Sequence, residues 1–504
     1  MLAWLPHHRQ HVRNALVVAM STTSAAAAMP PATPRAAYVH LPFCRRRCFY
    51  CDFPISVVGS KPGAADAAAE RYCALLHREI AASPSRQPGA PPLASLYFGG
   101  GTPSLTPPPL LAGLVDGLRD AYGLADGCEV TLEMDPGTFD VARLRAFLEA
   151  GVTRVSLGVQ SFDDKLLTSA GRSHDAAEAR AAVELLMQAQ SSAGSPLRSV
   201  SVDLIGGLPG EDLASWRRSL NAAATTGAQH ISVYDLQVEP RTAYGRWAEA
   251  GTLKALPDEA LAAEMYREAS AVLRAHGLQR YEVSSFGREG HRSQHNSAYW
   301  RNEPFFAFGL GATSHLDGVR LARPRRMDAY EAFVRRLEGA EGAGRQHRTA
   351  GGQRLTTRGS GGAAASAAGD RGFAAAQAEL GVREEGVEAM TTLIMLQLRT
   401  TRGLLPAELT PRFGETLAAA AEGACRDAAA ELPAEWWVME AEEASGGGDS
   451  GAEAAPRCRR FALRDPEGLL FSNDAISTVF ARLDERLERD DVGGGGLGGC
   501  EAGS

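Results

Sequence analysis

Residues 38–53 read YVHLPFCRRRCFYCDF and carry the strongest signal in the sequence. Cys44, Cys48 and Cys51 stand in a C-x3-C-x2-C spacing within this stretch. Cysteine thiolates hold the irons of iron–sulfur clusters, so three of them on one short loop can bind three irons of a [4Fe-4S] cluster. The fourth iron then stays open to a different ligand. The spacing predicts a cluster-binding loop that follows a short strand.

A structural zinc site and a disulfide pair are the alternatives for these cysteines. Structural zinc takes four ligands, usually supplied as two separated pairs of cysteine or histidine. The remaining cysteines stand singly along the chain, at Cys73, Cys128, Cys425, Cys458 and Cys500. Eight cysteines in 504 residues are also too few for a disulfide scaffold and indicate a reducing compartment. The cluster is therefore the favoured interpretation.

The composition is that of a globular protein, with 44% hydrophobic and 22% charged residues. A chain of 504 residues suffices for one large α/β domain with a smaller domain attached. The formal net charge of -8 argues against nonspecific nucleic-acid binding, which needs a basic surface. No apolar run approaches the roughly 18 residues that cross a bilayer, so at most peripheral membrane contact is expected. The basic triplet at residues 45–47 is either solvated charge or a positive rim for an anionic partner or an electron donor.

The first 35 residues differ in composition from the rest of the chain. No Asp or Glu precedes Asp52, whereas arginines and a Ser/Thr/Ala-rich stretch over residues 20–28 are present. This composition predicts an organelle transit peptide over residues 1–35. Arg9 and Arg13 lie four residues apart, as do Val12 and Leu16, so a helix here would have a basic side and an apolar side. Mitochondrial presequences have this form, while chloroplast import and a merely disordered extension are the alternatives.

Short apolar segments alternate with helical patterns from residue 36 to about residue 239. Six of these segments predict strands, at residues 38–41, 95–98, 130–134, 154–159, 200–205 and 231–236. Such alternation predicts a parallel sheet with right-handed crossovers, with functional groups at the carboxyl ends of its strands. The polar motifs fall near those ends: Gly99, Gly100 and Gly101 follow the second strand, Glu133 and Gln160 close the third and fourth, and Asp203 lies in the fifth.

Beyond this core, which we place at residues 36–335, the sequence is less regular. Residues 339–379 are rich in Gly, Ala, Ser and Arg, and residues 440–456 are acidic and rich in Gly, so both read as flexible insertions. The tail from residue 490 to 504 is predicted to be disordered. Residues 384–403 have apolar side chains at helical intervals and open a small C-terminal domain over residues 380–489. Within it, FALRDPEGLLFSND predicts a strand, a turn and a second strand, as in a wing-like hairpin.

Together these motifs resemble the radical SAM superfamily, whose members bind a [4Fe-4S] cluster and S-adenosylmethionine (SAM). The flanks YVHLPF and DF of the cysteine loop, with RVSLGVQSF, GRSH, DLIGGLPGE, YEVSSF and GLGATSH, narrow the resemblance to the HemN/HemW branch. It covers roughly residues 38–330 and, more faintly, the C-terminal domain. The resemblance implies a partial (β/α)6 barrel followed by a small α+β domain that is similar to a winged helix.

The resemblance also implies which residues contact SAM. Carried over by position, these are Tyr38 and Tyr50 beside the cluster, Gly100, Gly101 and Thr102 in the Gly-rich turn, and Glu133, Gln160, Arg172 and Asp203 farther along the chain. Their polar groups suit the task, because a carboxylate accepts from ribose hydroxyls and a guanidinium pairs with the SAM carboxylate. The sequence has Asp135 where many relatives have Asn, which leaves the role of that residue open. No side chain need act as an acid or a base, and whether SAM is cleaved is open.

Two features separate the sub-families of this branch. Oxygen-independent coproporphyrinogen oxidases of the HemN type have a fourth cysteine two positions after the third, where this chain has Phe53. Residues 295–300 read HNSAYW and are similar to the HNxxYW motif of HemW, the heme chaperones. The resemblance therefore implies that the protein binds heme and transfers it to apo-hemoproteins of a respiratory chain, with a reductant for the cluster. The alternatives are coproporphyrinogen III dehydrogenase activity and a cluster-bearing scaffold without turnover.

His295 is the candidate heme contact within that motif. A neutral histidine nitrogen is a good axial ligand for heme iron, and Tyr299 and Trp300 could cover a porphyrin face. The alternative is that His295 and Asn296 form a buried, hydrogen-bonded turn while the aromatic rings pack in the core. His40 and His315 are weaker candidates for the heme ligand.

Overall fold

The computed structural model describes residues 33–61, 63–84, 86, 88–339, 372–441 and 458–493. Nearly all of the predicted transit peptide, most of both predicted insertions, and the end of the tail lie outside the described residues. Cys500 lies outside them as well. In the described part of the chain, no helix is long and apolar enough to cross a membrane.

A nine-stranded sheet in the order β11-β1-β4-β5-β6-β7-β8-β10-β9 forms the large domain. The six predicted strands are its centre: β1 (Ala36–Leu41), β4 (Leu93–Gly100), β5 (Leu124–Met134), β6 (Arg154–Gln160), β7 (Ser199–Gly206) and β8 (His230–Asp235). Neighbours among these six are parallel and follow one another in chain order, which confirms the prediction. The structure adds β11 (Phe306–Phe308), parallel to β1, and the antiparallel β10 (Ser285–Gly287) and β9 (Gln279–Arg280) at the other edge.

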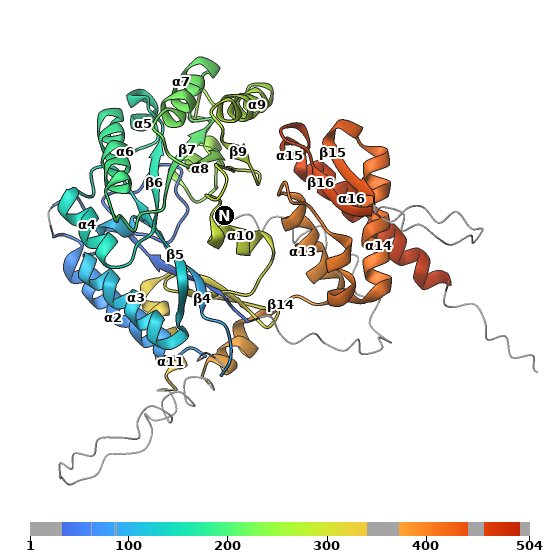
Figure 1. Cartoon of the computed structure of the whole chain (residues 1–504), viewed down its shortest axis with the longest axis horizontal. Helices are drawn as coiled ribbons and strands as arrows, with labels where there is room; N and C mark the ends of the chain where they lie inside the picture. Colours follow the sequence, from blue (N-terminus) through green and yellow to red (C-terminus); the bar gives the residue numbers. More distant parts are fainter. Residues whose placement is uncertain are drawn as a thin grey trace, which may run out of the picture.

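Helices connect the strands and cover the outer face of the sheet (Figure 1). They are α2 (Asp66–Ala81), α3 (Pro108–Tyr122), α4 (Val141–Glu149), α5 (Asp164–Ser169), α6 (Ala176–Ser191), α7 (Leu213–Ala224), α8 (Ala243–Glu249), α9 (Glu259–Ala275) and α11 (Met327–Leu337). Several start after an aspartate whose carboxylate accepts hydrogen bonds from first-turn N–H groups, as Asp140, Asp175 and Asp212 do. Strand β7 is buried at every position, as expected for a parallel strand covered on both faces.

The HNSAYW motif forms a short helix, α10 (Gln294–Trp300), which Ser293 caps and which packs against β4. After it, β12 (Thr313–Leu316), β13 (Val319–Ala322) and β14 (Val382–Arg383) make a small antiparallel sheet. Residues 372–380 are helical, and Phe373 and Ala376 are buried in the barrel core. The predicted flexible insertion over residues 339–379 is therefore wrong for its last residues, because an alanine-rich segment that reads as low complexity also forms a helix.

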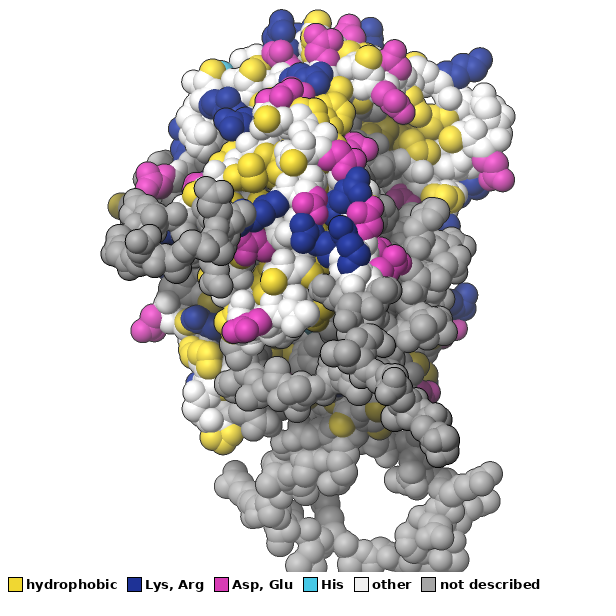
Figure 2. Space-filling model, turned by 90° about the vertical axis from the view of Figure 1, so that its right-hand side faces the viewer, with side chains coloured by type: hydrophobic (Ala, Val, Ile, Leu, Met, Phe, Trp, Pro, Cys, Tyr) yellow, Lys and Arg dark blue, Asp and Glu magenta, His cyan; other side chains and the backbone are white. Residues whose placement is uncertain are grey.

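The C-terminal domain lies beside the barrel and has its own hydrophobic core (Figure 1). It consists of α13 (Gly386–Leu398), α14 (Thr410–Glu431), β15 (Trp437–Ala441), β16 (Cys458–Leu463), α15 (Glu467–Leu470) and α16 (Ser472–Gly493). Basic and acidic side chains stand next to one another on the face seen in Figure 2, with hydrophobic side chains between them.

The predicted hairpin within FALRDPEGLLFSND is wrong. Strand β16 instead pairs with β15, which precedes it in the chain, and two helices follow it. Leu469, Ile476, Val479 and Leu483 are buried at helical spacing. Only Leu469 of these four lies within the quoted residues 461–474, so the helical period was not visible there. The predicted disordered tail also starts too early, since α16 continues to Gly493.

Candidate functional site

The cysteine loop begins at β2 (Phe43–Cys44), which pairs with β3 (Ser56–Val57), and so closes on itself. Cys44, Cys48 and Cys51 are free thiols, the first buried and the others half-buried. The Cys51 N–H donates to the Cys48 carbonyl over 3.2 Å, and the Thr102 hydroxyl lies 3.6 Å from Cys44 Sγ. Burial raises the pKa of the Cys44 thiol to about 12, so a metal must displace its proton to bind the thiolate.

The three sulfur atoms do not converge on one ion. Among the described residues, no group of three or more His, Cys, Asp or Glu side chains could hold a single metal ion. A cluster makes a different demand, because it offers a separate iron to each thiolate. The absence of a single-ion site among the described residues therefore does not argue against the predicted cluster.

The Gly-rich turn at the end of β4 approaches the cysteine loop closely. Gly100 has φ +122°, and a Cβ there would lie 2.5 Å from His40 Cε1. A Cβ at Gly101 would lie 2.7 Å from the Phe43 carbonyl oxygen. Both positions therefore require glycine for the turn itself. The Gly100 N–H donates to Glu133 Oε2 over 2.9 Å, which joins the turn to β5.

Two predicted carboxylates lie at the same edge of the sheet, Glu133 half-buried and Asp203 buried. Glu133 also accepts from the Tyr97 hydroxyl over 2.8 Å, and the Tyr97 ring stacks on Tyr38. Asp203 accepts from the hydroxyls of Ser156 and Ser201 over 2.8 and 3.0 Å. Burial raises the pKa of both acids. The serine partners of Asp203 carry no sequence signal of their own, since serine is common in strands that alternate with apolar residues.

Arg172 connects the cysteine loop with the sheet. Its Nη1 lies 3.3 Å from both Cys48 Sγ and the Tyr50 hydroxyl, and its Nη2 donates to the Gly158 carbonyl over 2.7 Å. The same Nη2 pairs with the Asp135 carboxylate. Burial would raise the pKa of Asp135, but the charge of Arg172 and the His174 ring, whose Nδ1 lies 3.8 Å from the carboxylate, outweigh it and hold that pKa low. Asp135, whose role the sequence left open, is thus the counter-ion of Arg172.

Two polar atoms of the predicted SAM contacts have no hydrogen-bond partner in the described part of the chain. They are Arg172 Nε and Gln160 Oε1, both buried. Gln160 also has φ +67°, which is uncommon for a residue other than glycine. A buried donor and a buried acceptor left unpaired are costly unless a ligand satisfies them. These two atoms suit the amino acid moiety of SAM.

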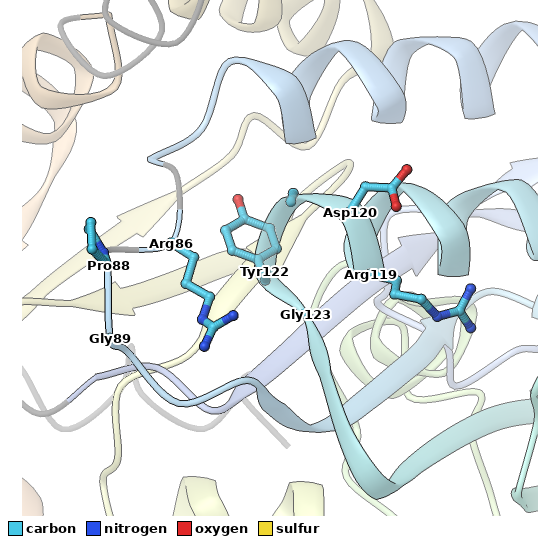
Figure 3. A pocket seen from close by; sticks show the side chains of 8 residues that line it. Arg86, Pro88, Gly89, Arg119, Asp120, Tyr122 and Gly123 are labelled. Carbon is cyan, nitrogen blue, oxygen red and sulfur yellow. The ribbon is translucent and has the colours of Figure 1, made fainter. Parts of the chain in front are cut away.

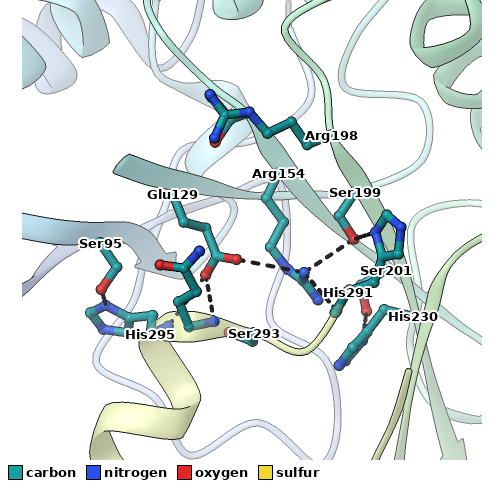
Figure 4. Close-up of polar contacts among 12 residues, drawn as sticks. Ser95, Glu129, Arg154, Arg198, Ser199, Ser201, His230, His291, Ser293 and His295 are labelled. Atoms are coloured by element: carbon teal, nitrogen blue, oxygen red, sulfur yellow. Dashed lines mark hydrogen bonds and ion pairs between the residues drawn. The ribbon is translucent and has the colours of Figure 1, made fainter. Parts of the chain in front are cut away.

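His295 lies apart from this group, beside Ser95 rather than at the carboxyl ends of the strands (Figure 4). Its side chain is 0% exposed, Nδ1 lies 3.0 Å from the Ser95 hydroxyl, and Nε2 lies 2.7 Å from the Tyr299 hydroxyl. Burial lowers its pKa to about 3, so the ring is neutral. This is the buried, hydrogen-bonded arrangement that the sequence left as the alternative. Heme ligation by His295 stays a prediction, and it requires one of these hydrogen bonds to break.

His40 and His315, the other two candidate heme ligands, are also buried. His40 Nδ1 lies 3.0 Å from the Tyr38 hydroxyl, and its Nε2 lies 2.9 Å from the Pro54 carbonyl oxygen, so both nitrogens are engaged. His315 keeps a buried Nδ1 without a hydrogen-bond partner among the described residues. Within the described residues, His315 is thus the one candidate of the three that has a ring nitrogen without a hydrogen-bond partner.

The sequence model of the Radical SAM superfamily matches residues 38–223. The heme chaperone HemW of Synechocystis is 35% identical over 458 residues, which cover 90% of this chain and 98% of that protein. The chain belongs to the HemW family of radical SAM proteins. Membership implies a [4Fe-4S] cluster and SAM, for which the cysteine loop and the two unpaired polar atoms provide a fitting site.

Other relatives of this HemW-family chain include a mitochondrial protein and a solved structure. The mitochondrial radical S-adenosyl methionine domain-containing protein 1 of Bos taurus is 41% identical over 283 residues, covering 56% of this chain and 61% of that protein. The solved coproporphyrinogen III oxidase HemN of Escherichia coli aligns over 90% of both chains with a TM-score of 0.64. At 18% identity, this likeness shows the fold alone. It extends over the barrel and the C-terminal domain together.

Proposed function

We propose that this chain is a heme chaperone that binds a [4Fe-4S] cluster, SAM and heme, and transfers heme to apo-hemoproteins. The observation that carries the proposal is the match to a HemW named as a heme chaperone over 98% of that protein. HemW proteins of Bacillus subtilis and Escherichia coli are 35% and 34% identical to this chain over shorter stretches. Phe53, which is 49% exposed, stands where the resembling oxidases have a fourth cysteine.

The residues of the site divide into two roles under this proposal. Cys44, Cys48 and Cys51 hold three irons, while Arg172 and Gln160 bind and orient SAM through their unpaired atoms. Asp135 holds the guanidinium of Arg172 in place, which fixes the direction of the free Nε. When bound and reduced, the cluster supplies one-electron chemistry to SAM. The remaining SAM contacts, at Tyr38, Tyr50, Gly100, Gly101, Thr102, Glu133 and Asp203, surround the same edge of the sheet.

Location in the mitochondrion is part of the proposal. It is supported by the mitochondrial relatives of Bos taurus and Mus musculus, which are 41% and 39% identical to this chain. The acid-free, arginine-containing stretch over residues 1–35 agrees with import into that organelle. Respiratory hemoproteins are then the expected recipients, and a mitochondrial electron donor the expected reductant.

Anaerobic reconstitution followed by two assays tests the proposal. The full chain is reconstituted with iron and sulfide, titrated with heme, and separately supplied with coproporphyrinogen, SAM and a reductant. We expect about one heme per chain, retained through gel filtration, and no protoporphyrinogen. Mixing the heme-loaded chain with an apo-cytochrome should move the heme absorbance to the acceptor.

The control variant is Cys48→Ala, which removes one cluster ligand. It should lose iron, and it shows whether heme retention depends on the cluster. Accumulation of protoporphyrinogen with the wild-type chain would assign the oxidase function instead. Absence of both heme binding and turnover would contradict both functions.

A further inference from the structure

A pocket of about 260 Å³ opens at the amino-terminal ends of β6 and β7. These are the strand ends opposite to the cysteine loop, and a strand of seven residues separates the two by roughly 20 Å. The charged and titratable side chains that line it are Glu129, Arg154, Arg198, His291 and Arg292. We propose that this pocket binds a small oxyanion, a carboxylate or phosphate group, separately from the SAM and cluster site.

Arg154 is the central residue of the pocket. Its side chain is 4% exposed, so the charge is removed from bulk water. Nη1 donates to the Ser199 hydroxyl over 3.1 Å and to the His291 carbonyl over 3.0 Å (Figure 4). Nη2 is buried and has no hydrogen-bond partner in the described part of the chain. A buried guanidinium with an unused N–H group is a ready donor for an anionic oxygen.

The charges around Arg154 leave an excess of positive charge. Glu129 Oε2 is 3.7 Å from Arg154 Nη1, beyond a short bidentate pairing. Arg198 donates to the Gly127 carbonyl, and Arg292 lies over the Tyr281 ring. No carboxylate among the described residues forms an ion pair with either of these two arginines. Of the residues that the structure describes, Glu129 is the one carboxylate that lines the pocket beside these three guanidinium groups, of which Arg198 and Arg292 are exposed, so the pocket is positively charged and attracts an oxyanion.

His291, which also lines the pocket, carries no charge near pH 7. Burial and the neighbouring Arg154 and Arg288 lower the pKa of His291, which therefore remains neutral near pH 7. Its Nδ1 lies 3.4 Å from the Ser199 hydroxyl. Ser199 thus joins Arg154 and His291, and its hydroxyl is a second possible donor to a bound oxygen.

A second pocket of the molecule is also lined by arginines, but neither of them has a buried nitrogen without a partner among the described residues. It lies at the end of α3, has a volume of about 310 Å³ and is lined by Arg86 and Arg119 among others (Figure 3). Arg86 donates to the Ala90 carbonyl through two of its nitrogens, and Arg119 pairs with Asp116. Both cations are solvated or paired at the surface, and neither presents a buried unpaired donor. Of the arginines that line the two pockets, Arg154 is the one with a buried nitrogen that lacks a partner in the described part of the chain.

The size of the pocket limits the ligand. Liquid water takes about 30 Å³ per molecule, so the pocket holds on the order of eight waters or one small anion. It is too small for a macrocycle but admits a phosphate, a short dicarboxylate or a carboxylate arm of a larger molecule. The ligand would also affect α10, because Glu129 Oε1 accepts from the N–H groups of Gln294 and His295 over 2.9 and 3.2 Å.

Calorimetric titration of the full chain with orthophosphate, and separately with succinate, tests the proposal. The buffer is free of other oxyanions, and chloride keeps the ionic strength constant so that nonspecific charge effects are matched. We expect saturable binding of at least one anion at one site per chain. Arg292→Gln should weaken this binding about tenfold, as loss of a charge-assisted hydrogen bond does. Arg154→Gln should abolish it.

The matched control is Arg326→Gln, which removes an 81% exposed arginine that does not line the pocket and should bind the anion like the wild-type chain. If Arg154→Gln does not fold, Arg292→Gln decides the question, because its side chain is exposed. Preference for succinate or for phosphate identifies the class of the natural ligand. Failure of both anions to bind, or equal binding by wild type and Arg292→Gln, would overturn the proposal.

Discussion

At the scale of single residues, Arg172 carries the most connections of the candidate site. Its guanidinium contacts Cys48 and Tyr50 on the cysteine loop and Asp135 and the Gly158 carbonyl on the sheet. The GRSH motif was enough to predict Arg172 as a site residue, but its partners could not be predicted from the sequence. Asp135 precedes it by 37 positions, and only the packing of β6 against β5 brings the two together.

Arg172→Ala should weaken SAM binding and also make the cluster more labile. The first effect follows from the loss of a charged hydrogen bond, which costs about 1.5–3 kcal/mol, and the second from the loss of a positive charge beside the Cys48 sulfur. Calorimetric SAM titration and iron analysis of the reconstituted protein measure the two effects. The comparison variant is Asp203→Ala, which should weaken SAM binding with iron content unchanged. Wild-type SAM affinity in both variants would contradict the assigned site.

His295→Ala should lower the free energy of unfolding by about 1–3 kcal/mol, because it leaves the Ser95 and Tyr299 hydroxyls without a buried partner. Urea unfolding of the apo-protein measures this effect. The heme absorbance spectrum distinguishes a structural role of His295 from a role as an axial heme ligand. Tyr299→Phe removes one of the same hydrogen bonds but frees Nε2, so it should preserve or strengthen heme binding if His295 is an axial ligand. A loss of heme in both variants, or in neither, would argue for a purely structural histidine.

At the scale of elements, the six central strands of the barrel could be predicted from the sequence, whereas the pairing of β15 with β16 in the C-terminal domain could not. In the central strands apolar residues alternate with polar ones, as Val200, Val202 and Leu204 do with Ser199, Ser201 and Asp203 in β7, and the alternation of such strands with helical segments predicts a parallel sheet. Strands β9, β10 and β11 have two or three residues each, too few for any periodicity. The hairpin error at residues 461–474 has the same origin, since the helical period becomes visible only when residues up to 483 are included.

Gly100→Ala should destabilise the turn at the end of β4 and loosen the cysteine loop. A Cβ at this position would clash with the His40 ring, and φ +122° is unfavourable for alanine. We expect a loss of about 2–4 kcal/mol, combining backbone strain and the clash, together with slower cluster assembly. Gly251→Ala is the control, because φ is +67° there but nothing lies within 4 Å of the added carbon. It should cost only about 1–2 kcal/mol. Equal losses in the two variants would show that the contact with His40 is unimportant.

At the scale of the whole molecule, a small set of ion pairs joins the barrel to the C-terminal domain. Asp465, just before α15, lies 2.7 Å from Arg280 on β9 and 2.5 Å from Arg274 on α9. The Arg280 side chain is 1% exposed, and its guanidinium lies 3.8 Å from the centre of the Tyr266 ring. A second pair, Arg267 with Glu467, lies at the surface of the same junction.

Asp465→Asn should destabilise the junction strongly, since it leaves the buried charge of Arg280 without its counter-ion. Removing one partner of a buried pair typically costs about 3–5 kcal/mol. Glu467→Gln is the matched control, because its pair with Arg267 is exposed and should contribute less than about 1 kcal/mol. Thermal unfolding measures both, and we expect the transition of Asp465→Asn to separate into two steps as the domains uncouple. A single transition at the wild-type temperature would contradict this role.

The helix over residues 372–380 has a consequence for the order of events during synthesis. Phe373 and Ala376 fill the core of a barrel whose first strand begins at residue 36, and β1 pairs with β11 some 270 positions later. A ribosome that has made the six central strands has therefore not yet made the segments that complete the sheet edge and the core. Because domains fold as units during translation, the nascent barrel exposes apolar surface until residue 376 has left the exit tunnel. Chaperones that shield nascent chains are needed most over that interval.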